Sequence, residues 1–421
     1  MTKPTLNLTR REFTGLLGLG LTWPFTGALG ASTATRGFRI RTITAGVAFQ
    51  NGIELSPAES AVAFLKQARK AYEAEGHEVQ TLRIATQPLA EYLPDWDQPS
   101  SLQALRMLDR FAVDNNVVCS IGPVITDDQH HEGFAAWAAE LVQQTNNISL
   151  TVRVASPEEG VHHQSLRTAA EAIRAIARAT PGGEGNFRFA AIAFVPAGTP
   201  FFPAAYFSSA RAFSIGLESP NLLTAAFQGA GDFRQAQWQL KARMEKALGP
   251  VAARGQKLAQ QLGWNYLGID ASPAPGLDAS IGRAIETLTG APFGGPSTLA
   301  GCAAITDVLR ELDVQTCGYS GLMLPVLEDP VLAKRASEDG YGISELLLYS
   351  SVCGTGLDVV PLPGDTSVES LRAMIGDVAA LAAKYQKPLS ARLFPIPGRR
   401  AGERVSFDNP FLTETTVMTP G

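Results

Sequence analysis

Short β-branched or apolar runs alternate with longer stretches of helical spacing from residue 38 onward, and this alternation constrains the fold most strongly. The runs are FRIRTITAGVAF, EVQTLRIAT, NVVCSIGPVI, ISLTVRVAS, FRFAAIAFV, ARAFSIGLE, NYLGIDAS, GLDVVPLP and LSARLFPI. A helix between two strands favours parallel pairing, because a parallel pair needs a long crossover connection. The sequence therefore predicts an α/β fold, either one large barrel or a doubly wound sheet.

Three predicted helices begin at a recognisable signal. Ser56, Ser156 and Thr366 each stand three residues before a glutamate, which is the spacing of a capping box. After the first signal, apolar residues return at the spacing of one buried helix face; they are Ala61, Phe64, Leu65, Ala68 and Tyr72. Residues 232–262 have a polar helical pattern that Pro250 interrupts, so we expect two helices there.

The first 35 residues differ in kind from the rest. Arg10 and Arg11 precede an uncharged stretch, residues 13–35, that is rich in Gly, Leu and Thr. This pattern resembles a twin-arginine export signal, and residues 28–31 offer a small-residue cleavage site. We expect residues 1–35 to be a signal segment that the twin-arginine export machinery reads, which makes the protein periplasmic or exported. An uncleaved N-terminal anchor is the alternative.

Composition limits the class of protein and of partner. The chain has 421 residues, 45% of them hydrophobic and 18% charged, so it can bury a substantial core, and we expect residues 36–421 to form a single domain. The formal net charge of −5 does not indicate a positively charged surface for binding nucleic acid. A homo-oligomer stays possible. The four cysteines contain no CxxC pair, which favours buried thiols over a zinc or dithiol site.

Seven segments resemble, in order, the bacterial and archaeal family catalogued as domain of unknown function 711. They are IRTITAGV, GTPFFPAAYF, GIDASPAP, GPSTLAGCAAI, YSGLMLPVLED, CGTGLDVVPLPGDT and SARLFPIPG. The resemblance implies a ten-stranded α/β barrel similar to that of pyruvate formate-lyase and other glycyl-radical enzymes. It does not imply radical chemistry, because Arg404, Val405 and Ser406 run straight into Phe407 and the radical glycine of that motif is missing.

Polar residues near the ends of two predicted strands are candidates for catalysis. Loops at the carboxyl ends of strands build the sites of α/β folds. Asp270 ends one strand as a possible general base or metal ligand, with Ser272 beside it as a substrate contact; turn capping is the alternative. Cys353 precedes another strand and could act as a nucleophile; packing behind a glycine-rich turn is the alternative. Asp358 lies within that strand as a further candidate substrate contact.

A second group of candidates fits an anionic substrate. Ser297 and Thr298 follow two glycines and precede an apolar helix, so free N–H groups could hold a carboxylate or phosphate, although the same pattern is an ordinary helix cap. Arg41 and Arg392 lie in otherwise apolar strands and could bind a substrate carboxylate, or pair with neighbouring acids. Ser320 is a further candidate contact.

The histidines raise the question of a metal. The segments TDDQHHEG and GVHHQS each follow a predicted strand, and adjacent histidines point apart, so each pair offers one ligand. His130 and His163 with nearby carboxylates would suit Zn or Fe. Solvated loop residues are the alternative. The twin-arginine route carries folded cargo, which hints at a cofactor without identifying one.

These features together predict an exported α/β barrel that binds a small anionic molecule. The first hypothesis is a non-radical hydrolase or lyase with Asp270 as the base, Arg41 and Arg392 on the substrate carboxylate, and Cys353 assisting. The alternative is a periplasmic binding or sensing protein that uses the same arginines without chemistry.

Overall fold

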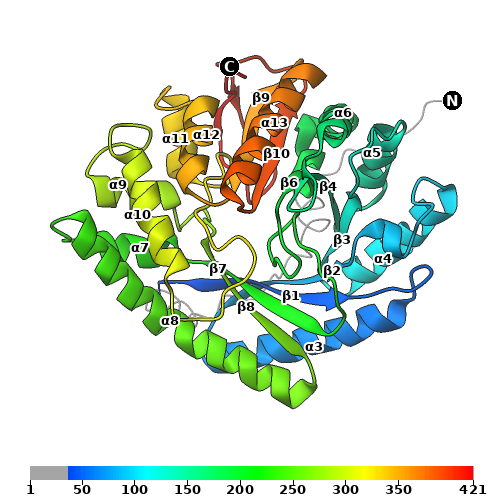
Figure 1. Ribbon diagram of the computed structural model, residues 1–421, viewed down its shortest axis with the longest axis horizontal. Helices are drawn as coiled ribbons and strands as arrows, with labels where there is room; N and C mark the ends of the chain where they lie inside the picture. The colour runs from blue at the N-terminus through cyan, green and yellow to red at the C-terminus, as the bar shows by residue number, and fades with distance from the viewer. Residues whose placement is uncertain (1–36, 421) are drawn as a thin grey trace.

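The computed structural model describes residues 37–420, and its centre is a ten-stranded, mostly parallel sheet (Figure 1). The strand order is β8-β7-β1-β2-β3-β4-β6-β10-β9, with the short β5 paired to β4. The strands are β1 (Arg39–Val47), β2 (Val79–Thr86), β3 (Val118–Ile125), β4 (Ile148–Ser156), β5 (Gly160–Val161), β6 (Phe189–Ala193), β7 (Ala212–Glu218), β8 (Asn265–Pro273), β9 (Gly356–Pro363) and β10 (Leu389–Ile396). The α/β class predicted from the alternation is confirmed.

The sheet contains two opposed strand directions. Strands β1, β2, β3, β4 and β6 pair in parallel, as do β7 with β8 and β9 with β10. The two directions meet antiparallel where β1 pairs β7 and where β10 pairs β6. The amino ends of the first set therefore share one side of the molecule with the carboxyl ends of the other strands.

The sheet edges β8 and β9 do not pair with each other. The irregular segment 315–326 lies against both of them, with one isolated parallel bridge from Thr316 to Ile269 of β8 and one from Pro325 to Asp358 of β9. A closed ring of ten regular strands, as the family resemblance implies, is not found among the described residues. The arrangement is compatible with an α/β barrel.

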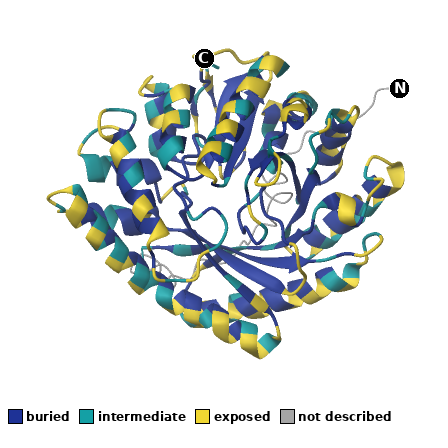
Figure 2. Cartoon of the chain, viewed as in Figure 1, coloured by how far each residue is buried: buried dark blue, intermediate teal, exposed yellow. Residues whose placement is uncertain are grey.

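Helices cover the outer face of the sheet, with their buried sides turned inward (Figures 1 and 2). They are α3 (Leu55–Ala74), α4 (Pro99–Asp114), α5 (Phe134–Gln144), α6 (His163–Ala179), α7 (Pro220–Phe227), α8 (Phe233–Leu262), α9 (Ile281–Thr289), α10 (Thr298–Arg310), α11 (Pro330–Ser337), α12 (Ile343–Val352) and α13 (Val368–Tyr385), with 3-10 turns η1 (Leu89–Glu91) and η2 (Pro181–Arg188). A small hairpin, β11 (Arg404–Val405) and β12 (Thr415–Thr416), lies near the C-terminus. No helix in residues 37–420 combines the length and apolar character needed to cross a membrane.

Two predictions about helices have opposite outcomes. The apolar face predicted from Ala61 to Tyr72 is buried in α3, and the Tyr72 hydroxyl donates to the Val251 carbonyl of α8 over 3.0 Å. The predicted break at Pro250 is wrong, because α8 continues through it as one helix of 30 residues. Proline removes a single backbone hydrogen bond, and the buried face on both sides of it, which includes Leu248 and Val251, keeps the helix whole.

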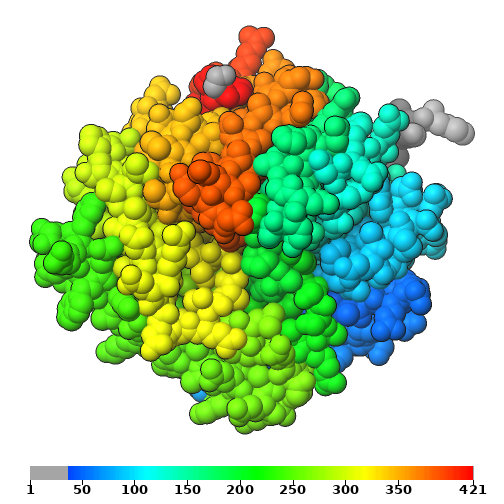
Figure 3. All heavy atoms as spheres, in the orientation of Figure 1, coloured from blue at the N-terminus to red at the C-terminus, as the bar shows by residue number. Residues whose placement is uncertain are grey.

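A small apolar cluster separates from the main core on the inner side of the sheet. Along β6, Ala191 and Ala193 belong to the main core, whereas Ala190 and Ile192 belong to the second cluster, as alternation on a strand requires. That cluster contains no residue of the α-helices; its other members are Val195, Phe201, Ala204, Tyr206, Ala274, Tyr319 and Met323. On the face drawn in Figure 3, atoms cover the middle of the molecule, so the gap between the ribbons of Figure 1 is filled there.

Candidate functional site

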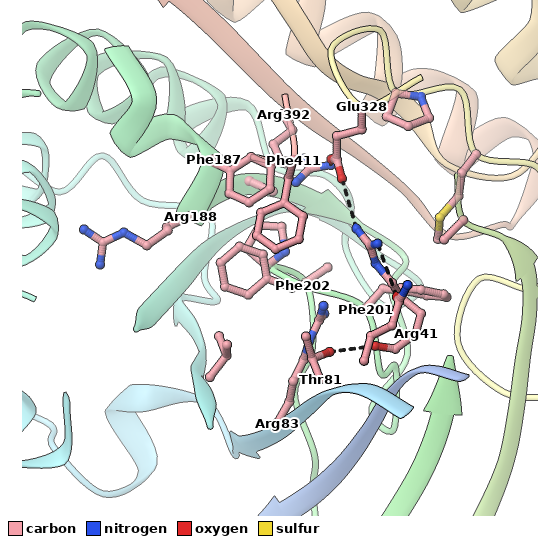
Figure 4. A pocket seen from close by; sticks show the side chains of 18 of the residues that line it. Arg41, Thr81, Arg83, Phe187, Arg188, Phe201, Phe202, Glu328, Arg392 and Phe411 are labelled. Carbon is pink, nitrogen blue, oxygen red and sulfur yellow. Dashed lines mark hydrogen bonds and ion pairs between the residues drawn. The ribbon is translucent and has the colours of Figure 1, made fainter. Parts of the chain in front are cut away.

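A cavity of about 370 Å³ lies inside the sheet, next to this inner cluster (Figure 4). Its wall draws on both strand directions: Arg41, Arg83 and Ala190 come from β1, β2 and β6, and Asp358 and Arg392 come from β9 and β10. Residues just before β3 and β4 complete one side; they are Asn116, Val117, Asn146 and Asn147. The cavity therefore faces the amino ends of several parallel strands, whereas the sequence predicts a site at carboxyl ends.

Three arginines of the cavity each lie over a phenyl ring. The guanidinium carbon of Arg41 is 5.7 Å from the ring centre of Phe411, that of Arg83 is 5.4 Å from the ring centre of Phe202, and that of Arg392 is 5.1 Å from the ring centre of Phe187. Figure 4 shows these side chains around the cavity. A cation over an aromatic face is attracted by the negative face of the ring, more strongly where water is excluded.

Two of these arginines are neutralised by carboxylates. Arg392 donates from Nε to Asp358 over 2.7 Å and from Nη2 to Glu328 over 2.5 Å. Arg41 donates from Nη1 to Glu218 over 2.9 Å, and its Nη2 is 3.6 Å from Glu328. Burial acts to lower the pKa of Arg392, but the two carboxylates outweigh it and hold the pKa above its usual value.

The third arginine, Arg83, has no such partner. Its Nε and Nη1 are shielded from solvent without a hydrogen bond, and no ion pair to Arg83 is found in residues 37–420. Burial lowers the pKa of Arg83 to about 9; repulsion from Arg41 and Arg392 adds to this, and Glu328 opposes it. Arg83 is still a cation at neutral pH, and among residues 37–420 no carboxylate forms an ion pair with it. Arg188, which also lines the cavity, has no carboxylate partner either, but its guanidinium donates to the Thr145 hydroxyl and to the carbonyls of Ile148 and Val142.

Alternation along β2 directs Arg83 into the cavity. Leu82 and Ile84 are buried in the main core between the sheet and the helices, whereas Thr81 and Arg83 line the cavity. The Thr81 hydroxyl donates to the carbonyl of Arg41 over 2.7 Å and ties β2 to β1. Sequence reasoning missed Arg83, although the signal was the one that identified Arg41 and Arg392, a charge within a predicted strand.

A smaller hollow of about 110 Å³ adjoins the cavity. It shares Arg41, Gln80, Glu328 and Phe411 with the larger space and adds Arg39, Glu218 and Asp278. Arg39 forms ion pairs with Glu218 over 2.7 Å and with Asp278. A chain of ion pairs therefore connects the exposed Asp278 through Arg39 and Glu218 to Arg41 in the cavity wall.

Of the residues predicted from the sequence, Arg41, Asp358 and Arg392 line the cavity together. The Asp270 carboxylate lies behind its wall and accepts hydrogen bonds from the Ser272 hydroxyl over 2.6 Å and from the backbone N–H groups of Tyr319 (2.8 Å) and Ser320 (2.9 Å). Burial raises the pKa of Asp270 to about 6, and these hydrogen bonds oppose the rise. Asp270, Ser272 and Ser320 thus join β8 to segment 315–326 and are not among the residues lining the cavity.

The remaining candidates lie away from the cavity wall. Cys353 is buried at the end of α12, where burial raises the pKa of its thiol to about 11 and Lys387 opposes the rise. Ser297 precedes α10 in a left-handed conformation, and the Thr298 hydroxyl accepts from the Gly294 N–H over 3.1 Å. All four cysteines are free.

The two histidines proposed as metal ligands have separate surroundings. The Nε2 atom of His130 is 2.9 Å from a carboxylate oxygen of Glu171, and His163 is exposed at the start of α6. Within the described part of the chain, no group of three or more His, Cys, Asp or Glu side chains is arranged to hold a metal ion.

Comparison with known proteins identifies relatives without an assigned activity. A family profile described as "Uncharacterised ACR (DUF711)" matches residues 33–408. A "UPF0210 protein" from Syntrophobacter fumaroxidans is 28% identical over 347 residues, which cover 77% of this chain and 76% of the relative. One from Pyrobaculum arsenaticum is 27% identical over 349 residues, covering 78% and 76%. One from Methanopyrus kandleri is 28% identical over 275 residues, covering 63% and 61%.

The predicted function, an exported hydrolase or lyase with a periplasmic binding or sensing protein as the alternative, is contradicted by these findings and is wrong. The matching family is uncharacterised, and the relatives, which come from archaea and anaerobes, bear a name that supports neither export nor these reactions. The twin-arginine pattern lies on residues 1–35, outside the described residues, so the signal and the localisation stay predictions. Similarity to pyruvate formate-lyase is not shown. What the match over residues 33–408 does establish is membership: the chain belongs to the uncharacterised family DUF711.

Proposed function

We propose that this protein binds a small organic anion in the cavity inside the sheet, and that Arg83 holds the anionic group. The observation that carries the proposal is the unmatched charge of Arg83 beside two arginines that are matched. A buried cation is costly unless it is paired and hydrogen-bonded, so an arginine of this kind marks a place for an anion that the chain itself does not supply. Its planar set of N–H donors suits a carboxylate.

The surroundings of Arg83 support an organic anion over a bare inorganic one. The cavity wall contains Phe187, Phe201, Phe202, Met323 and Tyr319, so most of a bound molecule would meet apolar surface. Cavities of roughly 300–1,000 Å³ with an apolar lining and a few convergent polar groups are typical of small-molecule sites. The volume of about 370 Å³ suits a compact ligand.

In this proposal, segment 315–326 closes the gap between the edge strands β8 and β9. With the nine strands of the continuous order, β5 excluded, it makes the tenth member of a barrel of the kind that the family resemblance implies. The Ile269 N–H donates to Gln315 over 2.9 Å and the Cys317 N–H to Ile269 over 3.0 Å, on the β8 side. On the β9 side, the Val326 N–H donates to the Asp358 carbonyl over 3.1 Å. These bonds support a ring that excludes water from the ligand and strengthens its contact with Arg83.

The test is a direct binding measurement by calorimetry with hexanoate, benzoate, succinate and inorganic phosphate, at low and at moderate salt. We expect one or more organic carboxylates to bind the wild type and the affinity to fall roughly ten- to hundredfold in Arg83→Gln. Arg106→Gln, at an exposed helical position, is the matched control and should bind as the wild type does. Absence of binding by every organic carboxylate, or equal binding by Arg83→Gln, would overturn the proposal.

A further inference from the structure

From the charges and rings of this cavity, we infer that its ligand is a flat aromatic monoanion, an aromatic or heteroaromatic carboxylate with a single negative charge. This inference rests on the anion site proposed above and narrows its substrate class. Three independent features of the cavity lead to it: the number of free positive charges, the chemistry of the wall and the available volume.

The charges of the cavity leave room for one negative group. Arg392 is bound by Asp358 and Glu328, and Arg41 is bound by Glu218 and approached by Glu328, so both are matched within the protein. A second anionic group on the ligand would have to displace one of these buried carboxylates or lie beside it without a counterion. Both are unfavourable, because a buried charge that loses its partner is strongly destabilising. Two further arginines line the cavity: Arg188 donates to the Thr145 hydroxyl and to two backbone carbonyls, and Arg69 is 4.0 Å from Glu73. Among the cavity arginines in residues 37–420, Arg83 is therefore the one with two nitrogens that have neither a hydrogen bond nor an ion pair.

The wall close to that charge is built from π systems. Phe202 lies against the Arg83 guanidinium, and Phe187, Phe201 and Phe411 come from three other parts of the chain to the same space. Tyr319 and Met323 face it from segment 315–326. Aromatic rings prefer offset or edge-to-face contact with other rings, and thioether sulfur also favours ring edges. A flat aromatic ring should therefore bind to this wall with a more favourable free energy than a saturated ring of the same size.

The volume sets the upper size of the ligand. A space of about 370 Å³ encloses a one-ring or a fused two-ring acid. The other arginines of the wall have partners within the protein, so a longer, multiply charged molecule would have to displace them. Nucleotides and other polyanions therefore do not match this cavity. Phe202 is the side chain that touches both features, because it stacks on Arg83 and lines the cavity.

The experiment compares matched probes by calorimetry on the full chain. Benzoate and 2-naphthoate are flat monoanions, cyclohexanecarboxylate has the same charge without flatness, phthalate adds a second charge, and benzamide removes the charge. We expect benzoate or 2-naphthoate to bind about tenfold or more tightly than each of the other three. Equal or tighter binding of cyclohexanecarboxylate or phthalate would overturn this inference.

Two variants separate the features of the ligand. Arg83→Gln should weaken benzoate but leave benzamide unchanged, and Phe202→Leu should reduce the preference for benzoate over cyclohexanecarboxylate by roughly three- to tenfold. An unchanged preference in Phe202→Leu would count against the inference. The two proposals fail differently: if no carboxylate binds, the anion site is wrong, whereas if only aliphatic or doubly charged acids bind in an Arg83-dependent way, the anion site stands and the aromatic class is wrong.

Discussion

Arg83 and Arg392 both lie on strands and line the same cavity, but they differ in whether a carboxylate neutralises their charge. Arg392 is held by two carboxylates, whereas Arg83 has none among residues 37–420. Removing one partner of a buried ion pair leaves the other charge buried without a counterion, which destabilises the folded state. Removing a buried charge that has no partner relieves the desolvation penalty of that charge, which stabilises the folded state. The two residues therefore give a matched test of the charge assignment.

We expect Arg83→Met to raise the free energy of unfolding by about 1–2 kcal/mol, and Arg392→Met to lower it by about 3–5 kcal/mol, because Glu328 and Asp358 would lose their counterion. Urea unfolding followed by circular dichroism measures both. A gain in stability with loss of ligand binding is the usual sign of a functional residue that costs stability. Destabilisation by Arg83→Met would mean that Arg83 has a partner in the folded chain.

Asp270 links stability to pH in a direction unusual for an aspartate. Its pKa in the folded protein, about 6, lies above the ordinary 3.8. The folded state therefore binds more protons between these values, so the stabilising contribution is fully present below about pH 4 and is lost as the pH rises through about 6. In Asp270→Asn this titration is absent. We expect the stability difference between wild type and variant to favour the wild type by roughly 1 kcal/mol more at about pH 5 than at about pH 7.5.

Urea unfolding at the two pH values measures this difference. Asp365→Asn, at an exposed position before α13, is the control and should show no such change. If the difference between wild type and Asp270→Asn is the same at both pH values, Asp270 does not titrate in this range.

At the scale of elements, the end of α12 depends on one lysine from a distant part of the chain. The Lys387 ammonium donates to the carbonyls of Ser350 (2.5 Å), Ser351 (2.9 Å) and Cys353 (2.6 Å). The last carbonyls of a helix have no partner within it, and a cation there also meets the negative end of the helix dipole. Lys387 thus fixes the loop that contains Cys353 to the start of β10.

We expect Lys387→Met to lower the free energy of unfolding by about 2–3 kcal/mol, since two buried carbonyls and one partly buried carbonyl lose their donor. Lys384→Met removes the same charge from an exposed position of α13 and should change stability by less than about 0.5 kcal/mol. Thermal and urea unfolding of the pair gives the comparison. Similar values for both variants would show that the carbonyls find other donors.

The positions of the strands could be predicted from the sequence, but the residues at which the helices begin could be predicted less well. Each of the nine apolar runs contains one long strand, because β-branched runs between helical stretches have few alternatives in an α/β chain. Ser156 is not a helix cap: it ends β4 before a tight turn to β5, and α6 begins only at His163. Ser367, not Thr366, caps α13 and accepts from the Ser370 N–H over 3.0 Å. Neighbouring hydroxyls offer the same local signal, and only tertiary packing selects one.

For the whole molecule, what the sequence did not reveal was the change of strand direction. Between β6 and β7, residues 194–211 contain no helix, so the chain reverses there without a crossover, and β1 and β10 receive antiparallel neighbours. The rule that sites of α/β folds lie at the carboxyl ends of the strands then fails, because amino ends of some strands and carboxyl ends of others surround the cavity. Arg41 and Arg392 were found because a charge in an apolar strand is conspicuous. Arg83 lies between the apolar Leu82 and Ile84 and carries the same signal, but the polar Gln80 and Thr81 just before it make its strand less clearly apolar.

The cavity also has a consequence for synthesis. Its wall runs from Arg41 in the first strand to Phe411, and Arg83 comes far earlier in the sequence than Glu328, Asp358 and Arg392. A nascent polypeptide on the ribosome therefore holds Arg83 long before Asp358, Glu328 and Arg392 emerge. A ligand site that needs all of these residues forms only after segments hundreds of positions apart have folded together, so occupancy reports on the folding of the whole sheet.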